Sequence, residues 1–201
     1  MARLARITQS LRKCKMTRHI RFIQAALIFA MVAMPIISSR PAVAATAEEI
    51  NRDAAAALKR LYNTEPKAKE LGAKAKGILV FPKIYEAGFI GGAHFGEGTL
   101  LVKGKPVAYY NSVEGSFGLQ AGVQRFSYVL FIMKDFVLDD FKNSSGFELG
   151  VGPSIVVVDV GAAKSLTTMT LKADIYAFIS DQKGLMAGLK LKGAKITKVD
   201  K

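Results

Sequence analysis

From Gly77 onward, short apolar segments alternate with Gly, Pro, Asn and Asp. The segments are rich in β-branched and aromatic residues, and their length and spacing are typical of strands in β-sandwiches and β-barrels. We therefore predict a largely antiparallel, β-rich body that is sandwich-like or barrel-like. The candidate strands are residues 78–81, 85–90, 98–102, 107–113, 117–124, 126–133, 147–151, 154–160, 173–180, 184–191 and 194–199.

Two helical segments precede this body. Residues 45–62 place apolar side chains at steps of three and four, and Thr46 and Glu49 have the spacing of a capping box. A second, shorter helical segment follows, for which Thr64 is the expected N-cap. Residues 135–143 interrupt the strands and predict one short inserted helix. The expected fold class is α+β, with the N-terminal helices packed on the sheet body.

Residues 1–44 have the pattern of a signal peptide. Basic residues lead into an apolar core at 22–37, and residues 42–44 form a small-x-small cleavage motif. We expect cleavage after Ala44, with Ala47 as the second choice. The removed segment carries eight of the basic residues and no acidic residue.

An uncleaved membrane anchor is the alternative, but an apolar core of 16 residues is shorter than the roughly 20 that a spanning helix needs. A start of translation at Met16 would leave residues 1–15 as an upstream extension. We expect one mature domain, residues 45–201, that is periplasmic or secreted and peripheral on a membrane.

The charge of this domain gives no support to a nucleic-acid partner. Residues 45–201 carry 21 Lys and Arg against 16 Asp and Glu, so the net charge is 21 − 16 = +5. This excess is too small to indicate a nucleic-acid surface. The one cysteine, Cys14, precedes the cleavage point, so the mature domain has neither a disulfide nor a thiolate ligand. We expect no cofactor and no metal site.

The glycine-rich stretch GFIGGAHFGEG, residues 88–98, raises the question of a nucleotide-binding loop. A dinucleotide or phosphate loop requires a helix directly after it, whereas a strand-turn-strand pattern follows here. His94 could act as a general base beside Glu86 or Glu97, but the sequence shows no nucleophile and orienting partner for it. We therefore expect a β-bend-β segment and no enzymatic activity.

Three polar residues remain candidates for a specific role. Glu97 lies between two glycines, and Gln120 shares one face of the alternating stretch 117–124 with glycines. Asp174 lies within a strand-like run, where an inward carboxylate is costly unless it is paired. A hydrogen bond to backbone or to a lysine is the simpler expectation for such a carboxylate.

Basic residues gather in the helical region and at the start of the sheet. They form either an ordinary solvated surface or a contact with anionic headgroups, which attract each nearby cation by about 1 kcal/mol. These residues are Lys59, Arg60, Lys67, Lys69, Lys74, Lys76 and Lys83.

Three stretches in sequence order carry a family resemblance: AKGILVFPKIYEAGFIGGAHFGEGTLL at 75–101, NSVEGSFGLQAGVQ at 111–124, and LKADIYAFISDQKGLMAGLKLKG at 171–193. Together they resemble the SYLF-domain family, over about residues 45–199. The resemblance implies binding of membrane phospholipid, with which an N-terminal amphipathic helix has been associated. The family also carries an actin-binding label from fungal members, and we do not expect actin as a partner of an exported bacterial-type protein.

The expected function is therefore non-catalytic phospholipid binding at a membrane surface of the bacterial envelope. The basic residues would attract anionic headgroups, and an apolar helix face or a sheet-lined cleft would accept acyl chain. The alternative is a structural envelope module whose sheet edge binds another, unknown protein.

Overall fold

The computed structural model describes residues 44–88, 91–117, 122–158, 172–184 and 193–201. Ala44–Lys201 forms one compact unit, and the fold below is the fold of this unit. Nearly all of the predicted signal peptide (residues 1–43) and the candidate Gln120 lie outside the described residues.

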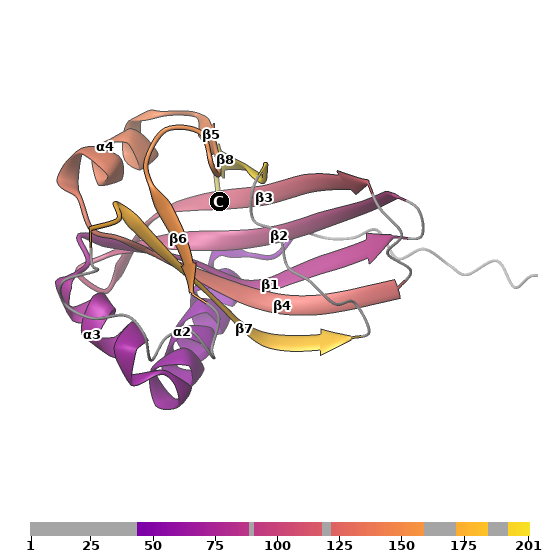
Figure 1. Cartoon of the computed structure of the whole chain (residues 1–201), viewed down its shortest axis with the longest axis horizontal. Coiled ribbons are helices and arrows are strands. Elements are labelled where there is room, and N and C mark those ends of the chain that lie inside the picture. The colour runs from indigo at the N-terminus through magenta and orange to yellow at the C-terminus, as the bar shows by residue number, and fades with distance from the viewer. Residues whose placement is uncertain (1–43, 89–90, 118–121, 159–171, 185–192) are drawn as a thin grey trace, which may run out of the picture. The chain divides into compact units, whose positions relative to one another are not determined.

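One eight-stranded sheet forms the body of this unit (Figure 1). Its strand order is β5-β8-β3-β2-β1-β4-β7-β6. Every pair is antiparallel except β6 and β7, which run parallel. The predicted α+β class with a β-rich body is confirmed. The strands are β1 Gly77–Gly88, β2 Gly91–Val102, β3 Lys105–Phe117, β4 Gly122–Ile132, β5 Gly146–Glu148, β6 Ile155–Val158, β7 Ile175–Gly184 and β8 Lys195–Val199.

The strand boundaries differ from the prediction in two informative places. The candidate strands 78–81 and 85–90 belong to one long strand, β1, whose register shifts near Pro82. Proline cannot donate to a strand ladder, so a bulge lets the strand continue past it. The single strand predicted at 117–124 is wrong, because β3 ends at Phe117 and β4 begins at Gly122.

Among the described residues, three helices accompany the sheet: α2 Ala47–Thr64, α3 Pro66–Lys74 and α4 Asp135–Asn143. The predicted capping box at the start of α2 is present, with Thr46 and Glu49 each accepting the backbone N–H of the other. Thr64 is not the N-cap of α3, because Glu65 occupies that position. The Thr64 hydroxyl instead donates to backbone carbonyls in the last turn of α2.

The helices cover opposite faces of the sheet (Figure 1). On one face, which we name the helix face, small residues such as Ala54 and Ala57 let α2 pack closely against β1 and β2. On the other face, named the α4 face, Val137, Leu138 and Phe141 of α4 pack over the sheet. The sheet therefore separates two apolar cores.

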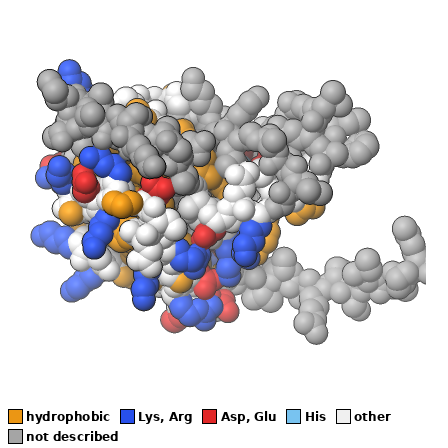
Figure 2. Space-filling model, turned by 60° about the horizontal axis from the view of Figure 1, so that its bottom comes forward, with side chains coloured by type: hydrophobic (Ala, Val, Ile, Leu, Met, Phe, Trp, Pro, Cys, Tyr) orange, Lys and Arg blue, Asp and Glu red, His pale blue; other side chains and the backbone are white. Residues whose placement is uncertain are grey.

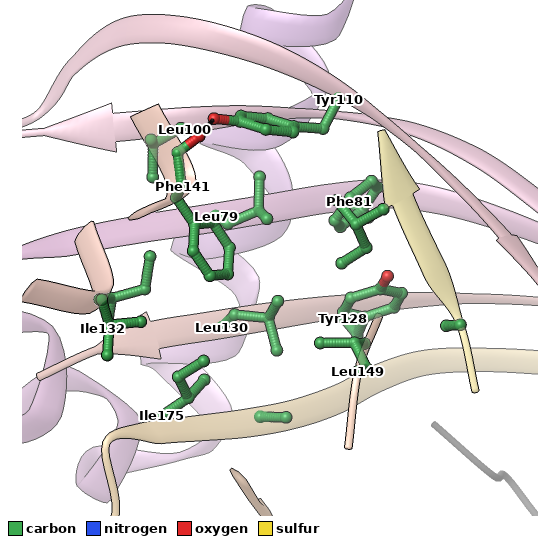
Figure 3. Packing of buried hydrophobic residues seen from close by; sticks show 14 of the residues in the cluster. Leu79, Phe81, Leu100, Tyr110, Tyr128, Leu130, Ile132, Phe141, Leu149 and Ile175 are labelled. Atoms are coloured by element: carbon green, nitrogen blue, oxygen red, sulfur yellow. Dashed lines mark hydrogen bonds between the residues drawn. The ribbon is translucent and has the colours of Figure 1, made fainter. Parts of the chain in front are cut away.

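Large aromatic and aliphatic side chains fill the core on the α4 face (Figure 3). Phe81 and Tyr128 pack with ring centroids 4.7 Å apart. The Tyr110 hydroxyl donates to the backbone carbonyl of Phe141, which fixes α4 to the sheet. Burial raises the pKa of Tyr110 to about 12, so this hydroxyl stays protonated as a donor.

Gly98 explains part of the glycine richness of residues 88–98. A Cβ atom at this position would lie 2.5 Å from the carbonyl oxygen of Val80 and 2.7 Å from a ring carbon of Phe81. Only glycine lets β2 approach the bulged part of β1 so closely. Residues 91–98 form part of β2, and residues 89–90, where the predicted bend would lie, are outside the described residues.

Gly98→Ala is expected to lower the free energy of unfolding by about 1–3 kcal/mol, because backbone atoms must move to admit the methyl group. Gly115→Ala on β3 is the matched control, since a Cβ there meets no atom within 4 Å; its change is expected to stay within about 0.5 kcal/mol. Urea unfolding of both variants measures this difference. Equal stability of the two variants would contradict the packing argument.

Candidate functional site

A row of paired residues crosses five strands near one end of the sheet. In register order from β4 to β8, the row is Arg125, Tyr85, Phe95, Val113 and Lys195. Directly opposed residues of neighbouring strands project from the same face. The row therefore places two aromatic rings and a valine between two cations.

These apolar side chains are uncovered. Tyr85 is 52% exposed, Phe95 48% and Val113 48%. Tyr85 and Phe95 project from the helix face, because the residues that precede them in the chain, Ile84 and His94, project from the α4 face. Strands β1 to β4 continue past α2 and α3, so neither of these helices covers this part of the face (Figure 1).

The next row along the strands extends the apolar surface. Ala87 pairs with Ala93 on β2 and with Val123 on β4, and all three are exposed. An exposed apolar surface of this kind commonly marks a contact with a partner or a membrane. We name the two rows together the Tyr85 patch, which comprises Tyr85, Ala87, Ala93, Phe95, Val113 and Val123.

Cations flank the patch on both sides. Arg125 pairs with Lys183 of β7, and Lys195 lies beyond Val113 on β8. Lys183 and Lys195 are exposed. One acidic residue, Glu148 of β5, is the register partner of Lys195. The patch thus has an apolar centre with a mainly basic border.

A polar row lies directly behind the patch, on the α4 face. Gln124, Glu86, His94 and Glu114 pair in register across β4, β1, β2 and β3. The Gln124 side-chain amide donates to the carboxylate of Glu86. His94 is 5% exposed, so this row is largely removed from water.

His94 belongs to a chain of polar contacts. The Tyr128 hydroxyl donates to Ser112 Oγ at 2.7 Å, and Ser112 Oγ lies 3.1 Å from His94 Nε2. His94 Nδ1 lies 3.4 Å from Glu114 Oε2. With the His94 hydrogen assigned to Nδ1, Ser112 can donate to Nε2 while it accepts from Tyr128, and the Nδ1–H group is directed to the Glu114 side.

The sequence analysis found no nucleophile, base and orienting partner, yet Ser112, His94 and Glu114 have that arrangement. These three residues could not be recognised as a set from their spacing in the sequence, because His94 lies on β2 and the other two lie on β3. Ser112 is fully buried and its oxygen already contacts both Tyr128 and His94. A nucleophile must reach its substrate, so the geometry fits a buried polar network that joins β2, β3 and β4.

Burial, opposed by the negative charge of Glu86, lowers the pKa of His94. The imidazole is therefore neutral at pH 7. Within the described ranges, no cluster of three or more His, Cys, Asp or Glu side chains could hold a metal ion.

Glu97 holds two parts of the chain together. Its Oε2 accepts the backbone N–H of Ala45 at 2.9 Å, and its Oε1 accepts from Lys201 Nζ at 2.6 Å. Lys201 Nζ also donates to the Ala45 carbonyl at 2.9 Å. The predicted polar role of Glu97 thus corresponds to a three-residue contact at the start of α2.

Asp174 precedes β7 and connects it to β6. Its carboxylate accepts from both the backbone N–H and the hydroxyl of Ser154. These hydrogen bonds lower the pKa of Asp174. They hold the start of β6 against β7, where the sheet's one parallel pair begins.

The predicted basic residues lie on α2, on α3, in the connection from α3 to β1, and on β1. Figure 2 shows Lys and Arg side chains over the face that these helices form, with acidic side chains among them. Four of the predicted residues are ion-paired: Arg60 with Asp181, Lys67 with Glu70, Lys76 with Asp135 and Lys83 with Asp53. Within the part of the chain that the structure describes, Lys59, Lys69 and Lys74 form no ion pair.

The apolar face of α2 is not available to a ligand in this structure. Ile50, Ala54, Ala57 and Leu61 are all buried beneath the helix. The sequence predicted two possible acceptors of an acyl chain, an apolar helix face or a sheet-lined cleft. The first of these, the apolar face of α2, is covered by the protein's own sheet. Among the described residues, no helix combines the length and the apolar character that crossing a membrane requires.

Residues 113–201 match the model of a protein family described as Las17-binding protein actin regulator, Ysc84, which is the SYLF domain. The match covers 89 of the chain's 201 residues, and over this part the chain is similar to the SYLF family. The predicted resemblance is thereby confirmed. SYLF domains are binding domains known for lipid and actin-related binding, and the family is not enzymatic. No curated protein matches the chain.

The region that matches the family model contributes the C-terminal side of the site. It starts at Val113 and includes Val123, Arg125, Lys183 and Lys195. Tyr85 and Phe95 lie before it and reach the site through the pairing of β1 with β4 and of β2 with β3. The Tyr85 patch was not evident from the sequence because its residues come from four strands, although the alternation of Tyr85, Ala87, Ala93 and Phe95 was visible.

The buried imidazole predicts a pH dependence of stability. Because the pKa of His94 is lowered on folding, the unfolded chain binds the proton more readily below its own pKa of about 6.5. The contribution of neutral His94 to stability is therefore complete above the pKa of the unfolded chain. It is lost as the pH falls through the pKa of His94 in the folded chain. We expect His94→Gln to unfold more easily at about pH 7.5 and to lose less stability on acidification.

Chemical denaturation at several pH values measures this slope. An NMR titration of the imidazole, assigned by comparison with His94→Gln, gives the pKa directly. A folded-state pKa of His94 at or above about 6.5 would contradict the burial argument.

Proposed function

We propose that this SYLF domain binds phospholipid at a membrane surface of the bacterial envelope, without catalysis, through the Tyr85 patch. The observation that carries the proposal is the exposed pair of aromatic rings, Tyr85 and Phe95, in a row that is bordered by Arg125 and Lys195. This surface combines exposed aromatic rings with neighbouring cations, and an anionic bilayer attracts both.

Each part of the patch has a physical counterpart in the bilayer. Aromatic side chains favour the boundary between headgroups and acyl chains, where an apolar ring meets a polar layer. Cations near an anionic surface each contribute about 1 kcal/mol. Arg125, Lys183 and Lys195 would thus contact headgroups while Tyr85 and Phe95 enter the boundary layer.

The basic residues of the helices have a smaller part in this proposal. Ion pairing already satisfies Arg60, Lys67, Lys76 and Lys83. Exposed ion pairs carry little net charge to a distant surface, and salt screens what remains. The unpaired Lys59, Lys69 and Lys74 would add long-range attraction without specific contacts.

The proposed location is the periplasm or the cell exterior, with the domain peripheral on a membrane. The leader pattern of residues 1–44 supports it. The printed family description refers to an actin regulator; for this chain the basic border and aromatic centre favour lipid.

Flotation with anionic and with neutral phosphatidylcholine vesicles tests the proposal. The Tyr85→Ser/Phe95→Ser double variant is expected to weaken binding to anionic vesicles by at least about tenfold, because it removes the apolar surface that enters the bilayer. Val107→Ser is the matched control, since Val107 is also half exposed but lies outside the patch. Thermal unfolding of each variant verifies the fold.

A second set of variants separates the two basic surfaces. Arg125→Gln/Lys183→Gln/Lys195→Gln is expected to abolish most of the preference for anionic vesicles, and Lys59→Gln/Lys69→Gln/Lys74→Gln to reduce it only slightly. If the helix variant instead loses more of the preference for anionic vesicles than the sheet variant does, the lipid-binding site lies on the helices. Absence of binding to both vesicle types, together with a stoichiometric protein partner, would favour the structural envelope module.

A further inference from the structure

The backbone N–H of Ala45, which lies outside any helix or strand, donates to a carboxylate. Glu97 Oε2 accepts this N–H at 2.9 Å, and the Glu97 side chain is only 13% exposed. Ala45 immediately follows Ala44, the residue after which the sequence predicts cleavage. The compact unit also begins at Ala44.

We propose that Glu97 is the binding site for the α-ammonium group of Ala45, which cleavage of the Ala44–Ala45 bond creates. Signal peptidase would add one water molecule across this peptide bond. The carbonyl carbon of Ala44 becomes a carboxylate, and the nitrogen of Ala45 becomes an ammonium group. The neutral hydrogen bond to Glu97 would thereby become a charge-assisted one, which is about twice as strong.

The carboxylate has room for this second cation. Lys201 Nζ occupies Oε1 at 2.6 Å, whereas Oε2 faces Ala45. Other charges nearby are already paired: Lys83, the register partner of Glu97, binds Asp53 of α2. Asn111, the register partner on β3, is neutral. Each carboxylate oxygen of Glu97 therefore serves one cation.

The geometry also distinguishes the two cleavage points that the sequence allows. Cleavage after Ala47 would remove Thr46, whose hydroxyl accepts the Glu49 N–H in the capping box of α2. It would also remove Ala45 and its contacts with Glu97 and Lys201. Cleavage after Ala44 preserves all of these. Residues 44–46 lie outside helices and strands, and Ala44 is exposed, as a protease substrate requires.

The test uses the full chain, expressed in a bacterial host that exports it, with the mature protein purified from the envelope fraction. Intact mass and N-terminal sequencing are expected to show Ala45 as the first residue. A second precursor carries Gly-Ser inserted between Ala44 and Ala45, so that its mature amino group is displaced from Glu97. Glu97→Gln is made in both precursors, and Glu148→Gln, an exposed carboxylate on β5, is the matched control.

Thermal unfolding of the four mature proteins forms a double-mutant cycle. Glu97→Gln is expected to lower Tm by about 3–6 °C more in the natural chain than in the extended chain. Glu148→Gln is expected to change neither. A mature protein that keeps residues 1–44 or begins at another residue overturns the proposal, and so does an equal effect of Glu97→Gln in both chains. Vesicle binding plays no part in the readout, so the outcome is independent of the proposed function.

Discussion

The pairing of β1 with β2 on one side and with β4 on the other determines where every other feature lies. This central strand carries Phe81 into one core and Val80 into the other, and it continues past a bulge at Pro82. Because neighbouring strands are locked to it in register, side chains far apart in sequence form straight rows across the sheet. Both the aromatic row of Tyr85 and the buried row of His94 depend on this register.

Local signals in the sequence predicted the elements well. The apolar steps and the capping box of α2 and the interruption at 135–143 depend on neighbouring residues only, and the structure has helices there. Thr64 was misassigned because Glu65 and Pro66 already end one helix and start the next. The strand expected at 117–124 failed because alternation continues across two strands that are separated by β2 and β1 in the sheet.

The candidate site was less accessible to sequence analysis, because it is made by strand order. Nothing in the linear chain relates Val113 to Tyr85, or Ser112 to Tyr128, and both pairs come together across the sheet. The basic helical residues were conspicuous in the sequence, yet acidic residues such as Asp53 and Asp181 pair with two of them from distant positions. The ion-pair partners of a charged residue become apparent only in the folded structure.

His94 and Phe95 are adjacent in β2 but project to opposite sides, one into the polar network and one onto the exposed patch. A strand inverts every later side chain when one residue is gained or lost. An insertion or deletion within β2 would therefore bury Phe95 among carboxylates and expose the imidazole. Over evolutionary time a change in the length of this strand therefore needs a compensating bulge, such as the one at Pro82 of β1, or must fall in the loops between strands.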